Sequence, residues 1–298
     1  MAARRGFATA QCRTRRASPI LVGFCPMLNL RPAAYLVYRW ILRPPFLEAR
    51  IPEFDLRLQV HTNDVIGRHL YKYRSYEPEV GRCLSNHVRF EPGDVVLDVG
   101  ANIGWYSLII ERMAKIPLDI LAFEPDPDNF ALLAENIRRN GCQMVTPIQA
   151  AAGPEHSQQL LYRYAKGNAG RHSLLPIHSG STVGINTVRL DDVWHQRGLG
   201  NRVLRLIKID VEGYELRALQ GAGDLLARCQ WLLAEYSPGF MRRGGMEPAD
   251  LVDLLDGHGL IPHQIRADGL KPLSRDGLLA LERQTNILWT RNAVMTAN

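Results

Sequence analysis

Apolar and polar positions alternate along most of the chain in a pattern that predicts its secondary structure. From residue 93 onward, short apolar runs of strand length are each followed by a segment whose apolar residues recur every three or four positions, as in an amphipathic helix. Repeated strand–helix units predict an α/β fold: a Rossmann-like, mostly parallel, seven-stranded sheet with helices on both faces. The strands are expected at 95–99, 119–123, 144–150, 204–209, 230–235, 260–265 and 286–290, and the main helices at 104–114, 127–139, 214–227 and 248–257.

Residues 160–186 interrupt this alternation. Strand-like residues alternate there with Gly, Asn and Ser, which predicts a hairpin excursion between the third and fourth strands. Ligands of open α/β sheets bind outside the carboxyl ends of the strands. We therefore expect the loops that follow the strands, together with this excursion, to form the functional site.

Positive charge is concentrated at the start of the chain. The first 47 residues contain eight Arg and no acid, and the remaining 28 Lys and Arg face 30 acids, so the rest of the chain carries a net charge of about −2. A nucleic-acid partner would need Lys and Arg spread over one face of the folded body. The charge distribution therefore argues against nucleic acid as a partner.

We expect a basic N-terminal extension, partly disordered or helical, over residues 1–59 and a main domain over residues 60–298. The extension resembles a transit peptide, a membrane anchor or a segment upstream of a second start at Met27. Within it, an apolar and aromatic face flanked by arginines suits either an anionic membrane surface or docking against the protein's own body. That face consists of Tyr35, Tyr38, Trp40 and Ile41, with Arg39 and Arg43 beside them.

The early apolar run "ILVGFCPML" is too short to span a bilayer, so we predict no transmembrane helix. Five cysteines without a CxxC pair indicate neither a disulfide framework nor a zinc knuckle. These features favour a cytoplasmic protein with a possible peripheral membrane contact through the extension. The sequence carries no signal for an oligomeric state.

The stretch "VVLDVGANIGWY" has the apolar strand, the glycines and the helix start of a nucleotide-binding loop. Gly100 can adopt a positive φ, and Gly104 lets the next helix pack closely. A dinucleotide fingerprint needs G-x-G-x-x-G, but Asn102 stands where its middle glycine would be, and Asp98 precedes the loop. An acid at this position suits a cationic ligand without phosphate, such as the methionine moiety of S-adenosylmethionine.

A second strand ends in "ILAFEPDPDNF", which places Glu124 where an acid can accept hydrogen bonds from both ribose hydroxyls. Such an acid occurs with nicotinamide and with S-adenosylmethionine cofactors, so it indicates adenosine binding without choosing between them. Asp126 is expected to cap the helix that Pro127 begins.

Acidic residues also follow the fourth and fifth strands. In "RLIKIDVEGYELRALQGA" an apolar strand delivers Asp210 to its carboxyl end, and Glu212 and Gly213 come next; "WLLAEYS" brings Glu235 to the same edge. Neighbouring strands lie about 5 Å apart, so Asp210 and Glu235 could share a proton or bind one hard divalent cation. Capping of the next helix is the alternative role for these acids.

The chain resembles the FkbM-type S-adenosylmethionine-dependent methyltransferases over roughly residues 60–240. The resemblance implies a class I methyltransferase fold and O-methylation of a hydroxyl on a sugar, a glycan or a secondary metabolite. The motifs that carry it are "DVGANIG", "FEP", "GNAGRHSL", "TVRLDDV" and "IKIDVEGYELRALQG". It places Asp98, Gly100, Asn102 and Gly104 at the methionine end of the cofactor, Glu124 at the ribose and Ala151 near the adenine.

An alcohol is a poor nucleophile until its proton leaves, so a base or a metal must assist the transfer. Asp210 is the first candidate for the base, with Glu212 and Glu235 beside it. His172 in the excursion is another candidate, because an imidazole titrates near neutral pH. A divalent metal is an open question, with Asp210 and Glu235 as its possible ligands.

Two other function classes stay open at this point. One is a nicotinamide-dependent oxidoreductase, which the interrupted glycine pattern disfavours. The other is a non-catalytic module that only binds the cofactor. Within methyl transfer, base-modifying enzymes place an [N/D/S]-P-P-aromatic segment or a Pro-Cys pair where this chain has "DVEG". A small-molecule or glycan acceptor is therefore expected.

Overall fold

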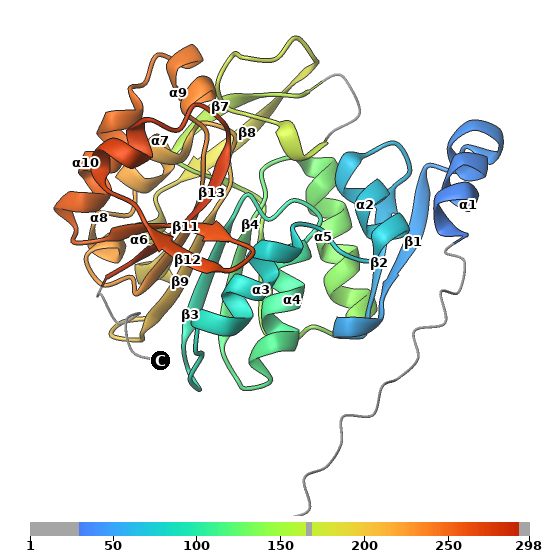
Figure 1. Ribbon diagram of the computed structural model, residues 1–298, viewed down its shortest axis with the longest axis horizontal. Helices are drawn as coiled ribbons and strands as arrows, with labels where there is room; N and C mark the ends of the chain where they lie inside the picture. Colours follow the sequence, from blue (N-terminus) through green and yellow to red (C-terminus); the bar gives the residue numbers. More distant parts are fainter. Residues whose placement is uncertain (1–29, 165–168, 292–298) are drawn as a thin grey trace, which may run out of the picture. The chain divides into compact units, whose positions relative to one another are not determined.

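The computed structural model describes residues 30–164 and 169–291 (Figure 1). Residues 31 onward form one compact unit. The suggested second start at Met27, most of the arginine-rich extension and the beginning of the "GNAGRHSL" motif lie outside the described residues.

One large sheet organises the fold, in the strand order β12-β11-β13-β10-β9-β3-β4-β5. The five strands from β10 to β5 in this order pair in parallel, and the other three are antiparallel. The sheet has eight strands where the pattern predicted seven, because the chain turns back at residues 267–268 and adds β12 to the edge. The strands are β3 (Val95–Val99), β4 (Asp119–Phe123), β5 (Val145–Ile148), β9 (Leu204–Ile209), β10 (Trp231–Tyr236), β11 (Ile261–Arg266), β12 (Gly269–Pro272) and β13 (Thr285–Thr290).

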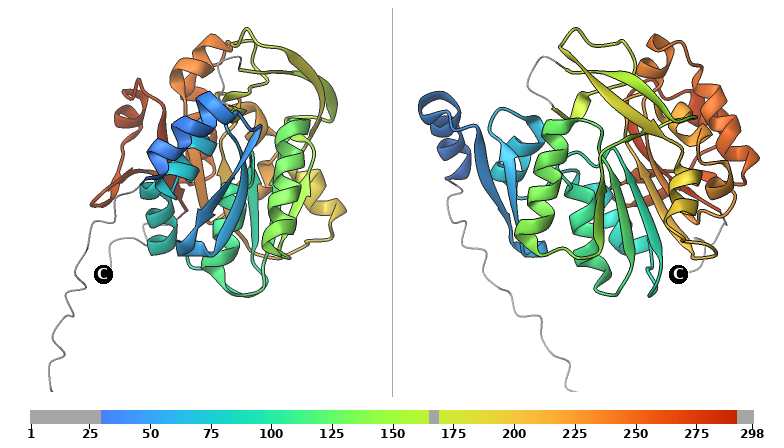
Figure 2. Two further views of the ribbon diagram at one scale, coloured as in Figure 1. Left: turned by 90° about the vertical axis from the view of Figure 1, so that its right-hand side faces the viewer. Right: turned by 180° about the vertical axis from the view of Figure 1, so that it is seen from behind.

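Helices cover both faces of this sheet, as Figures 1 and 2 show. Apolar side chains pack into two buried clusters, one with each layer of helices. One layer contains α3 (Pro78–His87), α4 (Trp105–Ala114) and α5 (Pro127–Asn140). The other contains α6 (Leu190–Gln196), α7 (Glu215–Gln220), α8 (Gly223–Leu226), α9 (Pro238–Arg243) and α10 (Pro248–Gly257), and the short α11 (Arg275–Leu279) precedes β13.

The single helix predicted over 214–227 is wrong, because the segment forms the two short helices α7 and α8. The break lies at Gly221, whose backbone approaches Gly153 so closely that an added Cβ would lie 2.0 Å from the Gly153 carbonyl oxygen. This close approach brings the helical segment against the start of the excursion. The spacing of apolar residues in the sequence did not indicate this contact between Gly221 and Gly153.

The excursion forms a separate three-stranded sheet in the order β6-β8-β7. Strands β7 (Ser157–Tyr162) and β8 (Thr182–Val188) pair antiparallel, which confirms the predicted hairpin. The strand predicted over 144–150 ends early, at Ile148, where β5 stops. Soon after it, strand β6 (Ala151–Ala152) pairs with β8 in the small sheet. A turn of 3-10 helix, η3 (Ala169–Arg171), follows the loop after β7.

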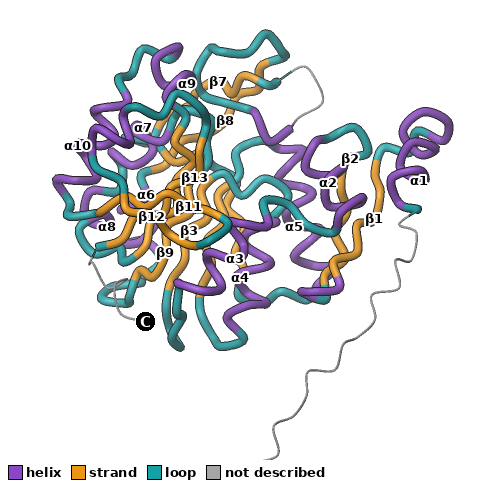
Figure 3. Tube along the Cα trace, in the orientation of Figure 1, coloured by secondary structure: helices purple, strands orange, loops and turns teal. Residues whose placement is uncertain are grey.

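Residues before the main sheet form further elements: the extension is helical over residues 31–42, as one expectation had it, and the strands that follow were not predicted. The elements are α1 (Arg31–Val37), the π-helical turn η1 (Tyr38–Leu42), β1 (Phe46–Ile51), η2 (Pro52–Phe54), β2 (Leu56–His61) and α2 (Val65–Tyr73). Strands β1 and β2 form a hairpin packed on α5, where Asn136 exchanges hydrogen bonds with the backbone of Gln59 (2.7 and 3.1 Å). Strand β2 runs across residue 59, so we propose that the main domain begins at Arg31. Figure 3 shows this hairpin apart from the main sheet.

None of the described helices is long and apolar enough to span a membrane.

Candidate functional site

A pocket with about 980 Å³ of empty space opens at the carboxyl ends of β3, β4, β9 and β10. Residues of the excursion and of α2 complete its wall. Eight of the ten site residues expected from the sequence line it: Gly100, Asn102, Glu124, Ala151, His172, Asp210, Glu212 and Glu235. The parallel sheet explains this convergence, because each of these strands ends at the same edge.

The loop after β3 turns through backbone conformations that need glycine. Gly100 has φ +79° and packs so closely on the next strand that an added Cβ would lie 1.9 Å from the carbonyl oxygen of Asp210. The amides of Gly100 and Ala101 both donate to the carbonyl of Phe123 (3.0 and 2.9 Å). The loop is therefore fixed against both neighbouring strands. Gly104 serves packing instead of the pocket, since an added Cβ would meet Leu108 and Leu133 side chains.

Glu124 is buried at the end of β4 and is tied to this loop. Its carboxylate accepts hydrogen bonds from the backbone amides of Asn102 (2.8 Å) and Asp126 (2.9 Å). Burial raises its pKa to about 7, although these two hydrogen bonds oppose the shift. Each carboxylate oxygen keeps a further lone pair that can accept a hydroxyl. Asp126 caps α5, as predicted, by accepting from the amides of Asp128 and Asn129.

Asp98 lies beneath the loop and is fully buried. Ser107 donates a hydrogen bond to one of its oxygens (2.6 Å), and the Lys208 ammonium lies 3.5 Å from the other. Asp98 does not line the pocket in the described part of the chain. Its negative charge is therefore balanced inside the protein, and its geometry offers no support for a direct contact with a cationic ligand.

Lys208 is a buried cation at the centre of the site. Its place in an apolar strand predicts that it either points outward or pairs with an acid, and the structure shows the pairing. Its Nζ donates to the Gly100 carbonyl (3.1 Å), lies 3.8 Å from an Asp210 oxygen, and stands 5.0 Å from the centre of the Tyr106 ring. Burial alone would lower its pKa, but the carboxylates of Asp98 and Asp210 more than offset burial and raise the pKa above its ordinary value. Lys208 therefore stays charged and joins the loop to the acidic strand ends.

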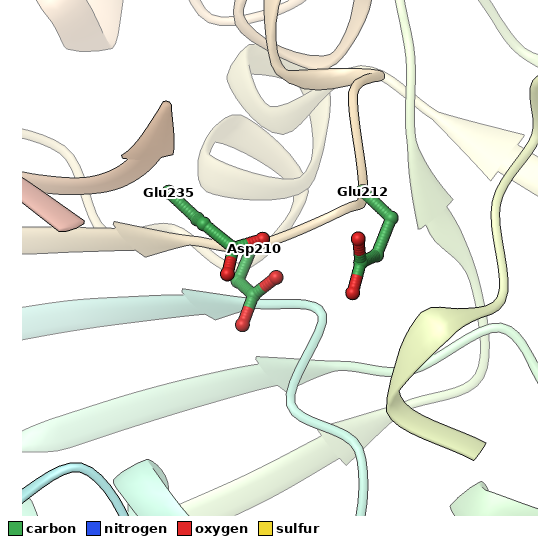
Figure 4. A group of neighbouring side chains, drawn as sticks. All are labelled: Asp210, Glu212 and Glu235. Atoms are coloured by element: carbon green, nitrogen blue, oxygen red, sulfur yellow. The ribbon is translucent and has the colours of Figure 1, made fainter. Parts of the chain in front are cut away.

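Asp210, Glu212 and Glu235 form the acidic cluster of the pocket (Figure 4). Ala234 pairs with Ile209 across the parallel strands, so the next residues, Glu235 and Asp210, lie side by side. Glu212 reaches the same point from a turn in which its φ is +52°. Carboxylate oxygens of the three residues lie within 4.8 Å of one another.

Crowding and burial keep protons on part of this cluster. Burial, and then the charge of Asp210, raise the pKa of Glu212 to about 8. Burial also raises the pKa of Glu235 well above its ordinary value, and the neighbouring charges of Asp210 and Glu212 add to the effect. The Asp210 side chain is 28% exposed, whereas that of Glu212 is 7% exposed. At neutral pH the cluster therefore combines protonated carboxyl groups with a group open to the pocket.

Gln284 holds two of these acids and was missed in the sequence. Its Nε2 donates to Glu212 (3.0 Å) and to Glu235. Strand β13 runs antiparallel to β10, and Thr285 pairs with Tyr236, so the residue before β13 necessarily lies at the edge where β10 ends. Only the strand order, which local patterns do not give, would have revealed it.

His172 does line the pocket, but it lies on the side of Asp126. Its Nδ1 accepts a hydrogen bond from the Tyr164 amide (3.1 Å), and its Nε2 is 4.0 Å from Asp126. Burial lowers its pKa, which favours the neutral imidazole. The contacts that the structure gives His172 are with Tyr164 and Asp126 and not with the three clustered acids. The acids are therefore the better candidates for the base.

Tyr76 and Glu77, which precede the main sheet in the sequence, differ in their relation to the pocket. Tyr76 lines the pocket, whereas Glu77 does not. The Glu77 carboxylate accepts hydrogen bonds from the Tyr106 hydroxyl and from the side-chain amide of Asn286 (3.2 Å). Burial and then the charge of Asp210 raise the pKa of Glu77. Glu77 therefore supports the wall of the site.

A further buried acid, Glu215, shapes the turn that carries Glu212. One of its oxygens accepts from the amides of Val211 (3.2 Å) and Gly213 (3.1 Å), and the other has no hydrogen-bond partner among the described residues. Burial raises its pKa to about 7. The folded state therefore holds a proton on Glu215 that the unfolded chain has released.

We predict that this proton makes stability fall as pH rises through 7. Between pH 6 and pH 8 the wild type should lose about 1 kcal/mol more free energy of unfolding than Glu215→Gln, which keeps the acceptor oxygen but does not titrate. Urea unfolding of both proteins at the two pH values measures the difference. Equal losses in the two proteins would contradict it.

A comparison with known proteins identifies the class to which this site belongs. The model of the FkbM methyltransferase domain matches residues 98–261, a range that contains the loop after β3, Glu124 and the whole acidic cluster. The chain belongs to the FkbM methyltransferase family. It is therefore a methyltransferase, and the predicted α/β methyltransferase fold is confirmed, with one strand more than expected.

Named relatives agree with this assignment. The 31-O-demethyl-FK506 methyltransferase FkbM of Streptomyces tacrolimicus is 30% identical over 229 residues, which cover 67% of this chain and 84% of the relative. The hexuronic acid methyltransferase AglP of Haloferax volcanii is 27% identical over 214 residues, 72% of this chain and 81% of the relative. A crystal structure of methyltransferase FkbM from Methylobacillus flagellatus is 20% identical with a TM-score of 0.46; the match covers 75% of this chain and 54% of that one.

Proposed function

We propose that this FkbM-family enzyme transfers a methyl group from S-adenosylmethionine to a hydroxyl oxygen of a sugar, a glycan or a secondary metabolite. The observation that carries the proposal is the meeting of Glu124, the Gly100 loop and three clustered carboxylates around one pocket. The proposed cofactor-binding residues and the proposed proton acceptors thus line a single cleft.

The residues that line the pocket suit the chemistry of the proposed cofactor. Glu124 would accept the ribose hydroxyls, the loop of Gly100 and Asn102 would hold the methionine end, and Ala151 would border the adenine. S-adenosylmethionine supplies an electrophilic methyl group, so the chain must align the acceptor and remove its proton.

We assign proton removal to Asp210. Its side chain lines the pocket and is 28% exposed, and one of its carboxylate oxygens lies 3.8 Å from the Lys208 ammonium. Glu235 and Glu212 hold protons beside it, because both have raised pKa values. Of the three acids, Asp210 is thus the one best placed to accept a proton from a hydroxyl.

The same three carboxylates also fit a hard divalent cation, since oxygen ligands are those that Mg²⁺ and Ca²⁺ prefer. Asp210, Glu212 and Glu235 would hold it, and it would supply Lewis-acid activation of the hydroxyl. Gln284 would orient the two glutamates in either case.

The nature of the acceptor rests on the relatives and on the pocket wall. One relative is named for 31-O-demethyl-FK506 and another for a hexuronic acid. Residues 170–174 and Leu161 of the excursion line the pocket, as expected for its acceptor side. None of the residues 237–247 lies among the lining residues of the described chain.

Glu124→Gln tests the cofactor assignment. We predict that the variant binds S-adenosylhomocysteine about tenfold more weakly, because it loses a charge-assisted acceptor for the ribose hydroxyls. Since the pKa of Glu124 is about 7, wild-type affinity should rise from pH 6 to pH 8, while that of the variant should stay level. Isothermal titration calorimetry measures both effects.

The exposed neighbour Asp128 provides the matched control, and Asp128→Asn should bind like the wild type. Incubation with S-adenosylmethionine and a panel of sugar and macrolide alcohols, read by mass spectrometry, tests the transfer itself. Binding of NADH in place of S-adenosylhomocysteine would contradict the proposed cofactor. Cofactor binding without turnover on any alcohol would contradict O-methylation.

A further inference from the structure

Helix α1 and the turn η1 carry apolar side chains that are exposed in the part of the chain that the structure describes. Trp40 is 60% exposed, Ile41 73% and Leu42 63%. Together with Leu36 and Val37 they form what we call the outer patch. Soluble proteins rarely leave such a continuous run of apolar side chains in water unless it contacts a partner.

The outer patch is not a loose segment, because the other side of the helix is anchored. Tyr35 is buried and its hydroxyl donates to the carbonyl of Thr62 (2.7 Å). The Tyr38 ring packs edge-on against Tyr71 with the ring centres 5.9 Å apart. Figure 1 and the right-hand view of Figure 2 show α1 at the edge of the described fold. The sequence left open whether this segment contacts a membrane or the protein's own body. In the structure Tyr35 and Tyr38 contact the body, and the outer patch consists of exposed side chains.

Arginines surround the outer patch. The Arg39 guanidinium lies 5.2 Å from the centre of the Trp40 ring, and the exposed Arg43 donates to the Trp40 carbonyl (3.1 Å). The chain has no acid before Glu48. An exposed Trp with aliphatic neighbours and flanking arginines matches the boundary between lipid tails and anionic headgroups.

We propose that the outer patch docks this enzyme on a bilayer that contains anionic phospholipids. Trp40 and Ile41 enter the headgroup boundary, and Arg39 and Arg43 contact lipid phosphates. Helix α1 packs against α2, and Ile66 of α2 lines the pocket. Helix α2 therefore connects the docking element to the pocket.

Co-sedimentation of the full-length chain with vesicles tests the proposal. The protein should pellet with phosphatidylcholine vesicles that contain phosphatidylglycerol, and binding should weaken as salt screens the charges. The double variant Trp40→Ser, Ile41→Ser should lower the partition constant about tenfold or more, because it removes two side chains that enter the boundary. Arg39→Gln with Arg43→Gln should lower it about tenfold without changing apolar area.

Leu160→Ser is the matched control, since Leu160 is 52% exposed on the distant strand β7 and its loss should leave vesicle binding unchanged. Brominated lipids should quench part of the tryptophan fluorescence of the wild type. They should quench the fluorescence of Trp40→Phe less, because this variant lacks the tryptophan that enters the headgroup boundary. Binding by the Trp40, Ile41 double variant at wild-type strength would overturn the proposal. So would equal binding to vesicles of phosphatidylcholine alone, or a wild-type dimer in sedimentation equilibrium that the double variant converts to monomer.

Discussion

Replacement of Asp210 by Asn should reduce the rate of methyl transfer about 100-fold or more while leaving S-adenosylhomocysteine affinity unchanged. A general base that is lost costs this much because the acceptor hydroxyl keeps its proton. The loss corresponds to about 2.7 kcal/mol in the activation free energy. The substitution keeps the backbone carbonyl of Asp210 that faces Gly100, so the cofactor loop should stay in place. Single-turnover kinetics and calorimetry measure the two quantities separately.

Glu212→Gln distinguishes the two ways in which the acidic cluster can work. The pKa of Glu212 is about 8, so at pH 7 most of this side chain is already neutral, and Gln imitates the neutral form. If the cluster acts through Asp210 as a base, Glu212→Gln should change the rate only a few-fold. If the cluster instead holds a divalent cation, Glu212→Gln should be as damaging as Asp210→Asn, and a chelator should abolish activity.

Asp268→Asn, at the exposed turn between β11 and β12, controls for the removal of a surface acid and should have wild-type kinetics. Full activity of Asp210→Asn would disprove the role assigned to Asp210. A loss of cofactor affinity in that variant would show that its effect comes from the loop instead of from proton transfer.

The part of the site that the sequence could predict is the part that follows directly from strand ends. In a parallel sheet every strand delivers its last residue to the same edge, so Glu124, Asp210 and Glu235 could be placed together from the apolar runs alone. The loop after β3 could also be predicted from the sequence, because its Gly100 has a positive φ and packs closely on the neighbouring strand end.

The rest depended on which strands are neighbours, and local patterns do not give that order. Asp98 pairs with Lys208 only because β9 lies beside β3, and this pairing turns a supposed ligand contact into an internal ion pair. Gln284 reaches the site only because β13 is antiparallel to β10. The β1–β2 hairpin was not predicted, although residues 46–51 and 56–61 alternate between buried and more exposed positions as strands with one covered face do.

Replacement of Gly100 by Ala should be the most damaging single-methyl change in the pocket. The new Cβ would lie 1.9 Å from the carbonyl oxygen of Asp210, a backbone atom that cannot rotate away, and the residue would also have to hold φ at +79°. Strain of this kind should lower the free energy of unfolding by about 3 kcal/mol or more. Any relaxation would move the loop or the end of β9, so cofactor binding should weaken even in the fraction that folds. Urea unfolding and calorimetry with S-adenosylhomocysteine measure the two effects.

Gly141→Ala separates the conformational part of this cost from the steric part. Gly141 ends α5 with φ +59°, and an added Cβ there meets no described atom within 4 Å. That variant should lose only about 1 kcal/mol, the usual cost of a left-handed alanine, and should bind cofactor normally. If Gly100→Ala lost no more stability than Gly141→Ala, the loop after β3 would have room to move away from Asp210. The close contact that positions the cofactor loop against the catalytic strand would then not be a requirement of the site.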